Sequence, residues 1–177
     1  FGLQYAINNG NIYANISRGF SNPSLEETLT PEGVINPDIS QETGTNYEIG
    51  AQWTLLQKRF SANIALYRMD INNLLVAQRV GEDQYIGTNA GETRHQGVEM
   101  DVKYIARLSN QLSLAPYFSY TFNDHVFVDF VDGDDDFSGN PLTGVPKHRL
   151  NTGVDLQHSN GLQLNLTHQY VDNIPLN

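Results

Sequence analysis

Apolar and polar residues alternate along most of this chain, and the clearest example lies near its middle. Val98, Met100, Val102 and Tyr104 point to one side of an extended segment, while the intervening residues, two acids and a lysine among them, point to the other. This pattern predicts a β-strand with one apolar face and one charged face. It fits a soluble sandwich, with protein core on one side and water on the other, and equally a membrane barrel, with lipid outside and a polar interior.

The same alternation recurs along the chain and predicts about eight antiparallel strands, so the fold class is expected to be all-β. The expected strands are Gly2–Ile7, Asn11–Phe20, Tyr47–Leu55, Phe60–Asp70, Gly97–Tyr104, Leu112–Phe122, Leu150–Leu156 and Leu162–Tyr170. Asn-Gly pairs before the second and eighth strands favour tight hairpins. Pro116 interrupts the sixth strand, where proline is expected only at an edge or a bulge.

The connections between these strands alternate in length. Short turns are expected at 8–10, 57–59, 108–110 and 159–161, and long segments at 21–43, 74–89 and 123–146. The first long segment should hold a helical turn near 24–27, and the second a small hairpin around 81–83. Outer-membrane barrels place short turns at one end and long loops at the other, whereas sandwiches segregate their loops less cleanly. This alternation favours the barrel.

A soluble β-sandwich adhesin or binding module remains the alternative, and burial separates the two folds. A sandwich would bury the apolar side chains between two sheets, whereas a single curved sheet would leave them bare. The residues that decide are Ile49, Trp53, Val98, Val102, Val154 and Leu156.

Composition removes several classes of function. The 177 residues carry a net charge of −10, which argues against nucleic acid as a partner. The absence of cysteine excludes disulfides and thiolate metal sites. No apolar run is long enough for a helical membrane span, and the mean hydropathy of −0.41 leaves barrels open because their strands are only half apolar.

Four stretches, in order along nearly the whole chain, resemble the barrel of TonB-dependent outer-membrane receptors, which import iron–siderophore complexes. They are Ser17–Phe20 with Pro23–Glu27, Asn36–Asp38 through Glu42–Thr43 to Asn46–Gly50, Asn89–Glu99, and Gly144–Leu150. Each stretch is short, and their shared order is what makes the resemblance specific.

The resemblance implies that residues 1–177 form part of a 22-stranded transmembrane β-barrel in the outer membrane of a Gram-negative bacterium. No plug domain and no aromatic C-terminal strand are found in the sequence, so it is expected to be an internal barrel fragment. The implied function is uptake of a ferric siderophore, energised through TonB, with outer-membrane lipid around the barrel. Cobalamin or a glycan is the alternative ligand, and no enzyme activity or cofactor is implied.

The residues that bear chemistry give weaker signals. The run Asp132–Asp136 invites calcium, but Phe137 and Thr143 stand where an EF-hand requires glycine and glutamate, so a solvated acidic loop is expected. The five histidines are scattered, and none is spaced with another histidine or a carboxylate as ligands on one strand face. No metal site or catalytic residue is predicted.

Several cationic and aromatic residues lie near the long-connection ends of their strands. The candidates for a ligand-binding rim are Arg18, Arg68, Arg94, Arg149, Tyr67 and Tyr85. Guanidinium groups there could bind the oxygens of an anionic ferric complex. The other interpretation is that the cations pair across strands with Glu48, Asp70, Glu99 and Asp155. Trp53, Tyr104, Tyr117 and Tyr170 are expected in aromatic girdles at the bilayer boundaries.

Overall fold

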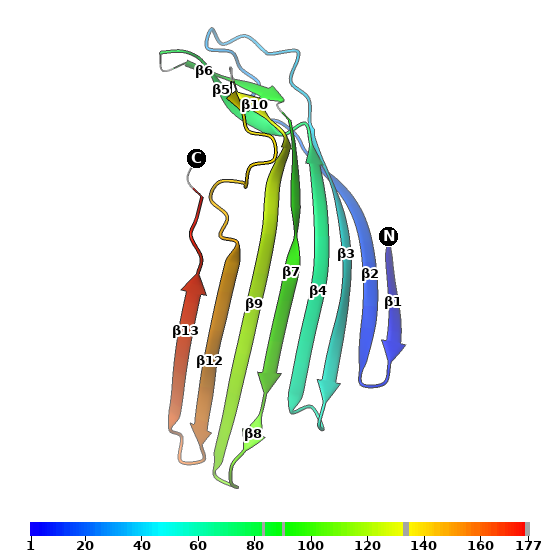
Figure 1. The fold of residues 1–177 in the computed structure, drawn as a ribbon, viewed down its shortest axis with the longest axis vertical. Helices are drawn as coiled ribbons and strands as arrows, with labels where there is room; N and C mark the ends of the chain where they lie inside the picture. The colour runs from blue at the N-terminus through cyan, green and yellow to red at the C-terminus, as the bar shows by residue number, and fades with distance from the viewer. Residues whose placement is uncertain (83, 90, 133–134, 176–177) are drawn as a thin grey trace.

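One antiparallel sheet forms the body of the protein, in a computed structural model that describes residues 1–82, 84–89, 91–132 and 135–175. Its strands neighbour one another in chain order (Figure 1). They are β1 Gly2–Ile7, β2 Gly10–Ser21, β3 Glu42–Leu55, β4 Phe60–Asn72, β7 Glu92–Tyr104, β8 Ala106–Arg107, β9 Leu112–Asp129, β12 His148–His158 and β13 Gln163–Val171. The described residues include no helix long and apolar enough to cross a membrane.

The two ends of the sheet differ as the sequence predicts. Short turns join the strands at the lower end in Figure 1, and the long connections gather at the upper end. Two small hairpins stand there outside the main sheet: β5 Leu75–Gly81 with β6 Gln84–Asn89, and β10 Val131–Asp132 with β11 Asp135–Asp136. The hairpin predicted around 81–83 is therefore confirmed, although Asp83 lies outside the described residues.

Across the middle of the sheet, the strand register sorts side chains into alternating apolar and polar rows. One row across the sheet consists of Ile12, Ala51, Ile64, Met100, Tyr120, Leu150 and Tyr170. The row next to it consists of Asn11, Gln52, Asn63, Asp101, Ser119, Asn151 and Gln169. Adjacent rows point to opposite sides of the sheet. We call the two sides the apolar face and the polar face.

The sheet is a single layer without a protein core. Ile49 is 52% exposed, Leu166 is 57% exposed, and none of the six side chains chosen to test the sandwich is buried. Ala51, on the apolar face, is the only apolar side chain among the described residues classed as buried. The sandwich interpretation is wrong, because none of the residues that the structure describes form a second sheet over the face that a sandwich would bury. A bilayer would cover it.

The apolar face has the height of a bilayer. Along β9 the apolar side chains of this face extend from Leu112 to Phe122, ten residue steps of about 3.3 Å each. That length, about 33 Å, becomes about 25 Å of membrane height at a tilt near 40°. Pro116 lies at neither an edge nor a bulge. β7 and β8 both pair with β9, and Pro116 lies opposite the break between these two strands. At that point β9 needs no amide donor.

Three tyrosines on the polar face lie over a glycine directly opposite on the next strand. The pairs are Tyr13 with Gly50, Tyr67 with Gly97, and Tyr117 with Gly153. A Cβ added at Gly50 would lie 2.5 Å from the Tyr13 ring, so these glycines are required by the close approach of an aromatic ring. Tyr117 was predicted in a girdle; its hydroxyl instead lies 2.8 Å from that of Thr167 on the polar face, so that prediction is wrong.

Candidate functional site

A cluster of polar side chains lies on the polar face, close to the long connections. Tyr67 of β4 donates to Asn123 Oδ1 at 2.9 Å, and its hydroxyl lies 3.0 Å from His125 Nε2 on β9. The rings of His95 and His125 face each other across β7 and β9, with centroids 4.7 Å apart. We call Tyr67, Thr93, His95, Asn123 and His125 the histidine cluster. These residues meet because the register brings alternate residues of three strands to one side.

Polar contacts fix the histidine cluster on most sides. Thr93, only 1% exposed, places its hydroxyl 3.0 Å from His95 Nε2. The Asn123 amide donates to the carbonyl of Pro146 at 2.9 Å, which ties the cluster to the third long connection. His125 Nδ1 is buried without a hydrogen-bond partner in the described part of the chain. Most polar atoms of the histidine cluster therefore bond to one another or to the backbone of the third long connection.

The sequence did not predict that two histidines would meet. His95 and His125 are thirty residues apart, so the spacing of ligands along a single strand gives no sign of the pair. Strand pairing places them opposite each other in the register of β7 and β9. Within the described ranges no group of three or more metal-binding side chains exists. The pair alone falls short of the usual ligand set for zinc.

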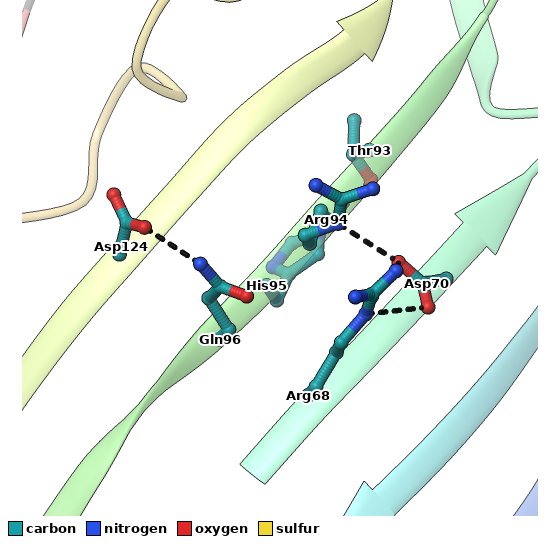
Figure 2. Close-up of polar contacts among 7 residues, drawn as sticks. All are labelled: Arg68, Asp70, Thr93, Arg94, His95, Gln96 and Asp124. Atoms are coloured by element: carbon teal, nitrogen blue, oxygen red, sulfur yellow. Dashed lines mark hydrogen bonds and ion pairs between the residues drawn. The ribbon is translucent and has the colours of Figure 1, made fainter.

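Three of the predicted rim arginines lie on the apolar face. Arg68 Nε lies 2.9 Å from one Asp70 carboxylate oxygen, and Arg94 Nε lies 3.2 Å from the other (Figure 2). Arg18 belongs to the same side of the sheet, since its row passes through Thr45 to Asp70. The prediction that Asp70 pairs across strands is confirmed. This group stands directly beyond the apolar row, where lipid headgroups would begin.

The remaining rim candidates occupy different places. Tyr67 belongs to the histidine cluster, and Arg149 is on the polar face opposite Thr121. Tyr85 is on β6, outside the main sheet, and is 55% exposed. The structure thus brings two of the six candidates to the polar face of the sheet. Glu48 was expected to pair with a cation and instead accepts a hydrogen bond from the Tyr13 hydroxyl at 2.7 Å.

Carboxylates on both faces of the sheet contact polar or charged side chains of nearby strands. Lys103 Nζ lies 3.8 Å from the Asp155 carboxylate, which is two strands away across β9, and Lys103 was not among the cations predicted to pair. On the apolar face, Gln96 donates to Asp124 at 2.7 Å (Figure 2). Asp124 and its neighbour His125, which is on the polar face, therefore point to opposite sides of the sheet.

The long connections are held to one another by specific hydrogen bonds. Ser40 N–H donates to Asn89 Oδ1 at 2.6 Å, and the Asn89 amide donates to the carbonyl of Asn73 at 2.8 Å. Glu42 accepts from the N–H of Leu75 at 2.7 Å. These bonds join the first and second connections at the point where β7 begins. They fix the place where the chain enters β7.

Two loop predictions concern acidic residues. Ser24 and Glu27 bond reciprocally at a single turn, with Ser24 N–H donating to Glu27 at 2.6 Å, so the predicted turn is confirmed. Gly133 and Asp134 of the acidic run lie outside the described residues. Asp136 accepts from Ser138 N–H at 2.9 Å, and this bond and the Ser138 hydroxyl bond hold the pKa of its carboxyl below the ordinary value.

Comparison with known proteins places this geometry in a family. The family model described as "TonB dependent receptor-like, beta-barrel" matches residues 1–175. The catecholate siderophore receptor Fiu of Escherichia coli (strain UTI89) is 30% identical over 106 residues, covering 56% of this chain and 13% of that protein. The matched part of this chain thus spans about an eighth of the length of that relative.

Solved structures show the same fold. The crystal structure of the ferric-catecholate import receptor Fiu from Escherichia coli K12 superposes with a TM-score of 0.68 and 23% identity, over 96% of this chain and 24% of that one. The siderophore receptor PiuA of Acinetobacter baumannii gives a TM-score of 0.72 and 19% identity, over 98% and 25%. From the family match over residues 1–175, the chain belongs to the TonB-dependent receptors and is part of the β-barrel wall of an outer-membrane protein of Gram-negative bacteria.

Proposed function

We propose that this chain is part of the barrel wall of a receptor that takes up a ferric siderophore across the outer membrane, energised through TonB. The observation that carries the proposal is the two-sided single sheet, which has one bilayer-high apolar face and one continuous polar face. Such a sheet separates lipid from a polar interior. The plug and the remaining strands would be supplied by other parts of the whole protein.

The ligand in this proposal comes from the relatives. Fiu carries the name of a catecholate siderophore receptor, and PiuA that of a siderophore receptor. In this chain, Tyr67 and Arg149 are the candidates to meet the ligand, because both belong to the polar face near the long connections. Tyr85 is a candidate on the outer hairpin. Arg18, Arg68 and Arg94 are left to the membrane boundary.

The test is iron uptake by the full-length parent protein in a bacterium that lacks its own siderophore receptors. We expect saturable binding of a ferric siderophore and accumulation of radioactive iron, with accumulation lost and binding retained when TonB is deleted. Replacing residues 130–143 by a short turn keeps β9 intact to Asp129 and should weaken binding. Asn160→Ala in a short turn is the control. Uptake of cobalamin or a glycan instead of iron would refute the ligand assignment.

A further inference from the structure

A band of cationic side chains crosses the apolar face at its long-connection end. Beyond the row of Phe122, the next two rows hold arginines on three strands: Arg18 of β2, Arg68 of β4 and Arg94 of β7. The ammonium of Lys147, the residue before β12, lies 5.9 Å from the centre of the Phe122 ring and extends the band towards β12. We call Arg18, Arg68, Arg94 and Lys147 the cationic band.

The cationic band is a positive region of an acidic protein. Among the described residues of its two rows, the carboxylates are Asp70 and Asp124, so the cationic band exceeds them by two positive charges. The whole chain, in contrast, carries a net charge of −10. The charge at this edge of the apolar face is therefore opposite in sign to that of the chain, and it suits an anionic partner.

Asp70 uses only part of the hydrogen-bonding capacity of its two arginines (Figure 2). In the described part of the chain, Arg94 donates through Nε alone, to Asp70 at 3.2 Å, and its side chain is 33% exposed. Arg68 donates to Asp70 through Nε and Nη2, and its side chain is 48% exposed. A guanidinium has five N–H donors in a planar fork that matches phosphate oxygens. Both arginines thus keep terminal donors for a phosphate.

The cationic band lies at the height of the lipid headgroups of the outer leaflet. Long connections mark the outer side of such a barrel, and short turns mark the periplasmic side (Figure 1). Arg68 follows Leu66, the last apolar residue of this face on β4, by about 7 Å along the strand. Tyr47 is in the same row as Arg68 and is 45% exposed, as in an aromatic girdle. Charges at this boundary are partly dehydrated, which strengthens their attraction to an anion.

The outer leaflet contains an anion that fits this position. It consists largely of lipopolysaccharide, and the lipid A anchor carries phosphates at both ends of its sugar headgroup. The cationic band likewise has two parts, because Arg94 on β7 and Lys147 beside β12 are separated by two strand spacings, about 10 Å. The apolar face beneath them would contact the acyl chains. Phospholipids of the inner leaflet lie at the opposite end of the sheet.

We propose that the cationic band binds lipid A of the outer leaflet, with Arg68 and Arg94 on one phosphate and Lys147 on the other. Arg18 adds to the positive potential from the row of Asp70. Guanidinium contacts of this kind need no bridging divalent cation. Asp70 orients both arginines and competes with the phosphate for them. The inference goes beyond the proposed function, since it concerns the lipid around the barrel and holds for any imported ligand.

The experiment measures lipid binding to the full-length parent protein in non-ionic detergent with EDTA, by native mass spectrometry. The probes are bisphosphorylated lipid A, the same lipid with its phosphates removed, phosphatidylglycerol and inorganic phosphate. The variants are Arg68→Gln, Arg94→Gln, the double variant and Asp70→Asn. Arg107→Gln is the matched control, because Arg107 is an exposed arginine on the polar face at the short-turn end. Heat-modified gel mobility checks that every variant is a folded barrel.

We expect the wild type to bind bisphosphorylated lipid A in EDTA, and each arginine variant to bind it about fivefold more weakly. The double variant should lose about 25-fold, with the control unchanged. Asp70→Asn should bind lipid A more tightly than the wild type, because the competing carboxylate is gone. If the arginines and Asp70 only stabilised the fold, Asp70→Asn would instead lose affinity together with the arginine variants.

Four results would overturn the inference. The first is equal wild-type affinity for lipid A with and without phosphates, and the second is wild-type affinity in the double arginine variant. The third is phosphatidylglycerol binding as tight as that of lipid A, which would leave a general lipid contact. The fourth is inorganic phosphate binding as tight as that of lipid A, which would indicate a site for soluble anions. The uptake of iron tests the proposed function separately from all four.

Discussion

Placing an arginine on the apolar face at Val102 tests which side of the sheet meets lipid. Val102 lies at the middle of the apolar row that runs from Val98 on β7 to Ala106 on β8. Its neighbours across the strands, Ala62 and Phe118, are apolar. A guanidinium there would have neither water nor an acidic partner on its own face.

The expected cost follows from this depth. Eight residue steps from Val98 to Ala106 cover about 26 Å along the strand, so Val102 lies about 13 Å from either end. A lipid-facing arginine at the midplane destabilises an outer-membrane barrel by about 2–4 kcal/mol. We therefore expect Val102→Arg to lower the free energy of unfolding by that amount.

The matched control is Ser119→Arg on the polar face. Ser119 lies opposite Asp101 and Asn151, so the new cation would gain an acidic neighbour and remain in water. Its effect should stay within about 0.5 kcal/mol. The assay is urea unfolding of the full-length parent in lipid vesicles, followed by tryptophan fluorescence and gel mobility. The assignment of the faces would be refuted if Val102→Arg left the free energy of unfolding unchanged, or if Ser119→Arg lowered it equally.

Three further outcomes are expected. Gly97→Ala should destabilise the barrel by about 1–3 kcal/mol in the same unfolding assay, because the added Cβ would clash with the backbone carbonyl oxygen of Phe122 and lie 2.7 Å from the Tyr67 hydroxyl; an unchanged midpoint would contradict this. Asp70→Asn should cost about 1 kcal/mol, the scale of two partly exposed ion pairs, and high salt should reduce the difference. Hydrogen bonds from Ser24 hold the pKa of Glu27 below its ordinary value, so the turn should be stable above that value and loosen as pH falls through the lowered pKa, seen as a smaller protection factor of the Ser24 amide against hydrogen exchange.

The short-turn end of the fold could be predicted from the sequence, and the long-connection end only in part. β4 begins at Phe60 and β9 at Leu112, as the alternation indicates. β9 continues to Asp129, seven residues past the predicted end at Phe122. Beyond Phe122 the strand is polar on both faces from Asn123 to His125 and apolar on both from Val126 to Val128, so the alternation no longer shows.

The candidate site shows which information the sequence held and which it lacked. Arg68 follows Leu66 by two residues and Arg18 follows Ile16 by two, so their place on the apolar face could have been read from parity alone. The meeting of His95 with His125 could not, because it depends on the register between β7 and β9. Alternation fixes the face of a residue but leaves its cross-strand partner undetermined.

The tyrosine–glycine pairs resolve an ambiguity that alternation leaves in any barrel wall. If two strands slide past each other by two residues, every side chain keeps its face. The same apolar face then meets lipid in the shifted wall and in the native wall, so burial in lipid does not favour either register. Such a slide would replace Gly97 beneath the Tyr67 ring by His95 or Glu99, whose Cβ atoms occupy the space the ring needs. The glycines thus make even-numbered slides costly, and they fix the stagger of the strands on which the barrel's width depends.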